Sequence, residues 1–133
     1  MKQLILIVSC VAMLALLGGC LEGKKSSDRQ ARDFTVCTEE QIPEEVKQMI
    51  EEKQENAFQF TYSLQEYVYI VIGYGEQPGG GYSIRVDECS EDEKNIYVDT
   101  TLLGSEESQD HNIKSHPYIA LKIIRPEKNI IFL

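Results

Sequence analysis

Few residues in this sequence have the types and the spacing that catalysis requires. The chain has two histidines, His111 and His116, at either end of a short polar stretch. Catalysis by proton transfer or by covalent attack needs an acid, a base or a nucleophile within hydrogen-bond reach of its partner. Neither histidine has a cysteine or an acid at a spacing that indicates such a pair, and His111 beside Asp110 is typical of a solvated loop. The sequence therefore predicts no catalytic residues and a protein that is not an enzyme.

An acidic run over residues 87–93 offers the hard carboxylate oxygens that Ca²⁺ prefers. The run lacks the regular ligand spacing and the central glycine of a calcium-binding loop. A solvated hairpin tip between two strands is the favoured interpretation. We therefore expect no metal and no other cofactor.

The most distinctive stretch, residues 73–81, holds five glycines and one proline. An apolar pattern precedes it over residues 67–72 and an alternating pattern follows over 82–86, which predicts a strand, a tight loop and a returning strand. Glycine reaches positive φ at no steric cost and leaves backbone N–H groups uncovered, so residues 75–81, the glycine loop, form either a plain turn or a contact surface for a partner or an anion. We expect positive φ at Gly80 and Gly81. The candidate partner-binding residues are Glu76, Gln77, Pro78, Gly79, Gly80, Gly81 and Tyr82.

The N-terminus has the pattern of an export signal. Lys2 is followed by an apolar stretch over residues 4–17 that is short for a membrane span, and small residues close it. The ending Leu17-Gly18-Gly19-Cys20 resembles the lipobox of bacterial lipoproteins, in which the cysteine is acylated; the alternative is an ordinary signal peptide with a chance cysteine. We expect a signal peptide over residues 1–19, lipidation at Cys20, a flexible tether over 20–32, and a protein anchored by lipid to the outside of the bacterial cell membrane.

Two cysteines remain after Cys10 and Cys20 are assigned to the signal and the lipid. Cys37 and Cys89 each end a predicted strand, and an oxidising compartment permits a bridge between them. The bridge would close a loop of about fifty residues and add roughly 4 kcal/mol. Two unpaired buried thiols are the alternative, whereas metal binding lacks the necessary ligand density.

The charge balance restricts the possible partners. Twenty-two acidic residues against 13 basic ones give a net charge of −9. Binding to nucleic acid or to an anionic lipid surface requires a basic protein surface, so neither is an expected partner. We expect any attachment to the membrane to be made by the lipid on Cys20.

The remaining residues, 33–133, form one predicted domain. Residues 39–56 are the single helix candidate, with Thr38 as N-cap and Pro43 dividing a first turn from the helix proper. Strand patterns run over 34–38, 58–62, 67–72, 81–89, 96–103, 118–124 and 129–133, and the 67–72 strand is apolar on both faces. The fold class is mostly β with a minor α component: a small antiparallel β-sandwich or curled sheet of about seven strands with one helix packed on it.

The residues around the glycine loop resemble a known family. Gly73-Tyr74-Gly75-Glu76-Gln77-Pro78 followed by Gly80-Gly81-Tyr82 resembles the signature of the PrcB C-terminal domain family, and the likeness covers roughly residues 67–124. These are small β-domains named for an accessory subunit of a bacterial surface protease complex. Gly79 stands where the family commonly has threonine, so we expect the fold to accept threonine there.

The resemblance implies a non-enzymatic binding module that docks on an envelope protein, such as a protease. The glycine loop and the strand ends beside it are the candidate contact surface. A protease inhibitor is the alternative, because a Pro-Gly-rich loop on a small β-sandwich also occurs in chagasin-type inhibitors of cysteine proteases. This chain lacks the asparagine and threonines of that inhibitory loop. A small-ligand carrier has no pocket signature in the sequence.

Overall fold

The structure is a computed structural model of the chain and describes residues 29–104 and 112–133. Residues 31–133 form one compact unit. The predicted signal peptide, Cys20, most of the predicted tether and His111 lie outside the described residues. Within the described part, no helix has the length and apolar character needed to cross a membrane.

The described elements are mostly strands, as predicted. A 3-10 helix spans Glu39–Gln41 and the α-helix α2 spans Glu44–Lys53. The strands are β1 (Gln30–Ala31), β2 (Thr35–Val36), β3 (Ala57–Leu64), β4 (Tyr67–Tyr74), β5 (Gln77–Pro78), β6 (Ser83–Glu91), β7 (Asn95–Leu103), β8 (Lys114–Ser115), β9 (Tyr118–Ile124) and β10 (Asn129–Phe132). The seven predicted strands correspond to β2, β3, β4, β6, β7, β9 and β10, and the three additional strands have two residues each.

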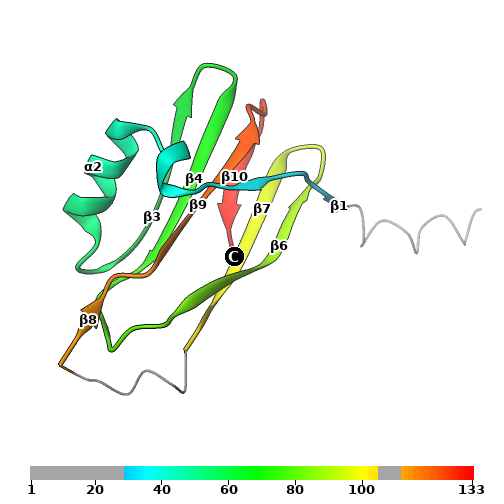
Figure 1. Ribbon diagram of the computed structural model, residues 1–133. Coiled ribbons are helices and arrows are strands. Elements are labelled where there is room, and N and C mark those ends of the chain that lie inside the picture. The colour runs from blue at the N-terminus through cyan, green and yellow to red at the C-terminus, as the bar shows by residue number, and fades with distance from the viewer. Residues whose placement is uncertain (1–28, 105–111) are drawn as a thin grey trace, which may run out of the picture. The chain divides into compact units, whose positions relative to one another are not determined.

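The strands form two four-stranded sheets and one small pair. The first sheet has the order β2-β9-β4-β3, the second has the order β1-β6-β7-β10, and β5 pairs with β8 (Figure 1). Neighbours in the first sheet are antiparallel, whereas β10 runs parallel to β7 at the edge of the second. The β-sandwich prediction is confirmed.

Strand β4 has apolar side chains on both faces, so it is covered by the second sheet on one face and by the helix on the other. Its residues alternate between two apolar environments, so Ile70 faces the second sheet and Val71 faces the helix. Between the sheets, a fully apolar core buries side chains of β4, β7 and β9: Val68, Ile70, Ile72, Ile96, Val98, Ile119, Leu121 and Ile123. The prediction of a strand buried on both faces is confirmed.

The helix covers the outer face of the first sheet (Figure 1). Val46 and Ile50 of α2 are buried against Val71 and Ala120, with Ile42 completing the cluster. The predicted break at Pro43 is present, since the 3-10 turn ends at Gln41 and α2 begins at Glu44. Proline has no N–H to donate, so it fits the start of a helix but not its interior.

A β-bulge in β6 determines which side chains face the core. The register with β7 shifts between Val86 and Glu88, which leaves Asp87 without a partner in the ladder. Cys89 consequently lies opposite Val98 of the inter-sheet core, where simple alternation from Val86 would have turned it outward.

The predicted disulfide is not formed, and both thiols are free. Cys37 lies in the cluster between the helix and the first sheet, whereas Cys89 faces the space between the two sheets. The first sheet therefore separates them. Burial raises the pKa of both thiols, although the Lys122 ammonium lowers that of Cys37 in part. This arrangement is the alternative of two unpaired thiols.

Arg32, the last residue of the predicted tether, is fixed by several contacts. Its backbone N–H donates to the Cys89 carbonyl at 2.9 Å, and its guanidinium donates to Glu91 Oε2 at 2.9 Å and to the Ile124 carbonyl at 2.8 Å. Lys128 Nζ donates to the same Glu91 oxygen at 3.0 Å. Lys128 and Arg32 together lower the pKa of the Glu91 carboxyl.

The cross-strand pair of Gly73 and Phe58 generates the first prediction. A Cβ on Gly73 would stand 2.0 Å from Phe58 Cε1, so Gly73→Ala must displace the aromatic ring. We expect a loss of about 1–3 kcal/mol in the free energy of unfolding, measured by urea denaturation. The loss should shrink in a Phe58→Leu background. Gly104→Ala is the matched control, because among the described residues its Cβ would meet only Tyr82, at 3.8 Å. Equal stability of the two alanine variants would contradict the packing described.

Glu91 generates a prediction on pH dependence. Its folded-state pKa is lowered, so its ion pairs stabilise the fold above the ordinary glutamate pKa of about 4.3 and lose this effect as pH falls through the folded-state value. Glu91→Gln should therefore be less stable than wild type at pH 7, and the difference should diminish toward acid pH in urea unfolding. Glu127→Gln, an exposed site in the neighbouring turn, should show no such trend. A difference independent of pH would exclude the electrostatic explanation.

Candidate functional site at the glycine loop

The glycine loop crosses from one sheet to the other. It connects β4 of the first sheet with β6 of the second, so the predicted hairpin, in which the two flanking strands would pair, is wrong. A crossing between packed sheets must turn away from one layer and enter the next, which requires backbone conformations that side chains restrict.

Backbone and side-chain hydrogen bonds hold the loop on both sides. Gln77 and Pro78 pair with Ser115 and Lys114, and Gly79 N–H donates to the Ile113 carbonyl at 2.6 Å. Gln77 Nε2 donates to the Tyr74 carbonyl at 3.0 Å, and the Tyr82 hydroxyl donates to the Pro78 carbonyl at 2.5 Å. The end of the segment after the helix also takes part, since Glu76 N–H donates to the Glu55 carbonyl at 3.2 Å.

Three glycines of the loop have positive φ: Gly75 at 76°, Gly79 at 80° and Gly81 at 78°. The expectation for Gly81 is confirmed, but the positive φ expected at Gly80 occurs at Gly79 instead. The expectation that threonine fits at position 79 is also contradicted, because a β-branched residue is strained in the left-handed region. Gly75 has a second reason to be glycine, since an added Cβ would lie 2.9 Å from the Ala57 nitrogen.

The predicted partner-binding residues differ in accessibility. Glu76, Pro78 and Gly81 are exposed, while Gln77, Gly80 and Tyr82 are half-buried. Gly79 is buried, so its role is to shape the loop rather than to offer a surface. The available surface is therefore the part of the loop around Glu76–Pro78 together with Gly81.

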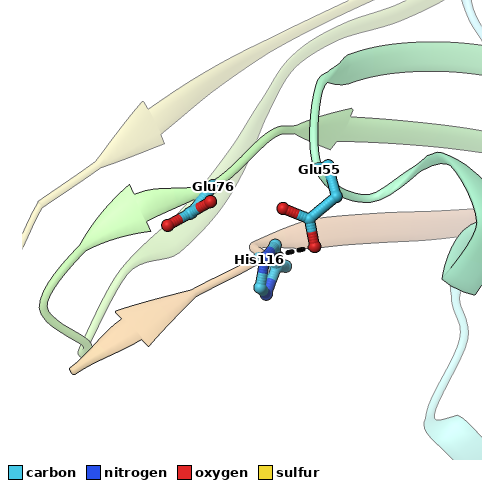
Figure 2. A group of neighbouring side chains, drawn as sticks. All are labelled: Glu55, Glu76 and His116. Carbon is cyan, nitrogen blue, oxygen red and sulfur yellow. Dashed lines mark ion pairs between the residues drawn. The ribbon is translucent and has the colours of Figure 1, made fainter.

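The structure brings His116 to the base of this surface, where it meets two carboxylates (Figure 2). His116 Nε2 lies 3.5 Å from Glu55 Oε1, and one ligand-type atom from each of Glu55, Glu76 and His116 falls within 4.8 Å of the others. Lys114 Nζ pairs with Glu76 Oε1 at 2.8 Å. This contact lowers the pKa of Glu76 and raises the pKa of Lys114.

No pattern in the sequence indicates this cluster. Glu55 follows the helix, Glu76 lies in the glycine loop and His116 precedes β9, so no local spacing connects them. The only local signal was the glycine run next to Glu76, which marks a close backbone approach without indicating which segment is approached.

The acidic run, in contrast, is a structured hairpin turn, as favoured from the sequence. Asp92 Oδ1 accepts from the backbone N–H groups of Lys94 and Asn95 at 2.9 and 2.7 Å, and Asp92 Oδ2 accepts from the Tyr97 hydroxyl at 2.6 Å. The carboxylate therefore serves to cap the turn between β6 and β7.

Comparison with known families gives a match for the part of the chain that contains the glycine loop and His116. Residues 68–123 match the family model described as PrcB C-terminal. This match confirms the resemblance for that part of the chain. It runs from the second residue of β4 to the last but one residue of β9, and it includes the glycine loop. No curated protein and no solved structure matches the chain.

The loop conformation generates a prediction that separates backbone strain from loss of contacts. Gly79→Thr should lower the free energy of unfolding by about 1–2 kcal/mol, because threonine is forced to φ near +80°. Gly80→Ala is the matched control, since its φ is not in the positive region, and it should remain close to wild type. The measurement is urea denaturation. A Gly79→Thr variant as stable as wild type would show that the loop does not keep this conformation.

Proposed function

We propose that this chain is a non-enzymatic, lipid-anchored module outside the cytoplasm, which docks on an envelope protein as an accessory subunit of a protease complex. The observation that carries the proposal is the PrcB C-terminal match over residues 68–123, because that family is named for such a subunit. The lipid anchor rests on the lipobox-like sequence that ends at Cys20.

The glycine loop is the proposed docking surface. Its backbone is held by the β5–β8 pair and by the contact between Glu76 and Glu55, so little conformational freedom is lost when a partner binds. Glu76 and Pro78 are exposed at this surface, and Lys114 beside them adds a basic side chain that is 69% exposed. A surface with both charges and a fixed backbone suits a protein partner.

An inhibitory plug receives less support from the same geometry. An inhibitory loop must enter an active-site cleft, but Pro78 is paired with Lys114, and Gly79 is buried and bonded to Ile113. These contacts keep the centre of the loop against the body of the domain. We therefore propose docking rather than inhibition.

Site-specific photo-crosslinking in cells tests the docking surface. A photoreactive amino acid replaces Glu76 or Pro78 in the full chain, and Lys94 at the distant β6–β7 turn serves as the exposed control site. We expect crosslinks to a subunit of an envelope protease from the loop positions and not from position 94. Crosslinks of equal yield from position 94, or none from the loop, would contradict the proposal.

The lipid and the effect on activity need separate comparisons. Cys20→Ala should move the chain from the membrane fraction to the soluble or unprocessed fraction, and unchanged fractionation would contradict lipid anchoring.

Adding purified protein to the crosslinked protease should maintain or raise proteolysis, whereas a stoichiometric loss of proteolysis would support the inhibitor instead.

A further inference from the structure

The cluster of Glu55, Glu76 and His116 combines three side chains of metal-ligand type from three separate segments. Figure 2 shows the Glu55 carboxylate directed at His116, with Glu76 on the neighbouring segment, and one ligand-type atom of each residue lies within 4.8 Å of the others. The histidine is half-buried, with 26% of its side chain exposed, and the Glu55 side chain is 67% exposed. The cluster is thus reachable from solvent at Glu55, whereas the histidine is largely covered.

The distance between His116 and Glu55 suits two ligands of one ion better than a hydrogen bond. His116 Nε2 lies 3.5 Å from Glu55 Oε1, beyond the usual 2.7–3.2 Å of N–H···O bonds. Nε2 is also buried and makes no hydrogen bond to any described residue. Two ligands bound at about 2.1 Å to a tetrahedral ion lie about 3.4 Å apart, which is close to the observed separation.

The backbone around the cluster is already in place. Glu76 N–H donates to the Glu55 carbonyl at 3.2 Å, and Tyr74 N–H donates to the Pro117 carbonyl at 3.0 Å, next to His116. These hydrogen bonds hold the three backbone segments that carry the side chains next to one another. Binding of an ion would therefore require rotation of the side chains but no movement of these segments. Metal sites gain affinity from such preorganisation because less ordering is required on binding.

Lys114 occupies one oxygen of the cluster in the structure. Its ammonium lies 2.8 Å from Glu76 Oε1, so the single positive charge of the lysine compensates part of the negative charge of the two carboxylates. The Lys114 side chain is 69% exposed and can turn away to solvent. A divalent cation would compensate both carboxylates at once, with Lys114 as its internal competitor.

We propose that Glu55, Glu76 and His116 form a binding site for a divalent transition-metal ion, and that Zn²⁺ fits the donor set best. Imidazole and carboxylate ligands suit zinc, whereas Ca²⁺ and Mg²⁺ favour sites made of oxygen alone. Three protein ligands leave a fourth position, open to water or to a side chain of another molecule. The ion would tie the glycine loop to the end of the helical segment and to the start of β9. The site shares Glu76 with the proposed docking surface, but zinc binding by the chain alone does not rest on the docking function.

Calorimetric titration of the purified full chain in detergent with ZnCl₂ tests the site. We expect saturable binding of one ion per chain, with Ca²⁺ and Mg²⁺ binding at least about tenfold more weakly. His116→Ala, Glu55→Gln and Glu76→Gln should each weaken zinc binding at least about tenfold, since even groups behind the ligands change affinity by 10–100-fold. Circular dichroism of each variant confirms that it is folded, and the two conservative glutamine variants carry the test if His116→Ala does not fold.

Matched controls distinguish this site from other zinc ligands of the chain. Glu52→Gln on the exposed side of α2, Cys37→Ser and His111→Ala should all retain wild-type zinc affinity. Lys114→Gln should bind zinc more tightly, because the competitor for Glu76 is removed, and this gain is not expected of a residue that only supports the fold. Absence of saturable binding, loss of binding in Cys37→Ser or His111→Ala, or unchanged affinity in the three site variants would overturn the proposal. Failure of the docking experiment would leave these results unaffected.

Discussion

The fold depends on one constraint, the burial of a sheet on both of its faces. Strand β4 is apolar at almost every position, so it needs a helix over one face and a second sheet over the other. Burial of apolar surface contributes about 25 cal/mol per Å², which makes this central layer the main source of stability. Because β4 belongs to the first sheet and β6 belongs to the second sheet, the chain between them has to cross from one sheet to the other. The glycine loop is that crossing.

Local patterns in the sequence were sufficient for the elements and their class. Each of these patterns reflects what one segment needs in order to fold. Examples are the alternation over 58–62, the continuous apolar run over 67–72 and Pro43 in front of the helix. Pairing is a property of two segments, so the sequence could not reveal that β4 and β6 belong to different sheets or that β10 lies parallel to β7. The bulge at Asp87 reverses the facing of Cys89, and alternation alone cannot show such a reversal.

The same distinction explains the candidate site. The glycines of the loop were recognised, since their φ requirement is local, but the exact positions with positive φ depend on how Gly79 meets Ile113 across the loop. The sequence around His116 indicates no partner for it, because its neighbours in sequence are not its neighbours in space. Glu55 and Glu76 reach it only after helix, central sheet and crossing loop are assembled.

The order in which the chain visits the two sheets has a consequence for what counts as a folding unit. From β4 to β10 the chain passes between the sheets three times, so neither layer is a continuous segment. The family segment 68–123 contains the middle of both sheets but not α2, β3 or β10. Cut out alone, it would expose Val71 and Ala120 on one side and an open strand edge on the other. The segment that matches the family, 68–123, is thus shorter than the unit that folds together, and the flanking elements complete the core of that unit.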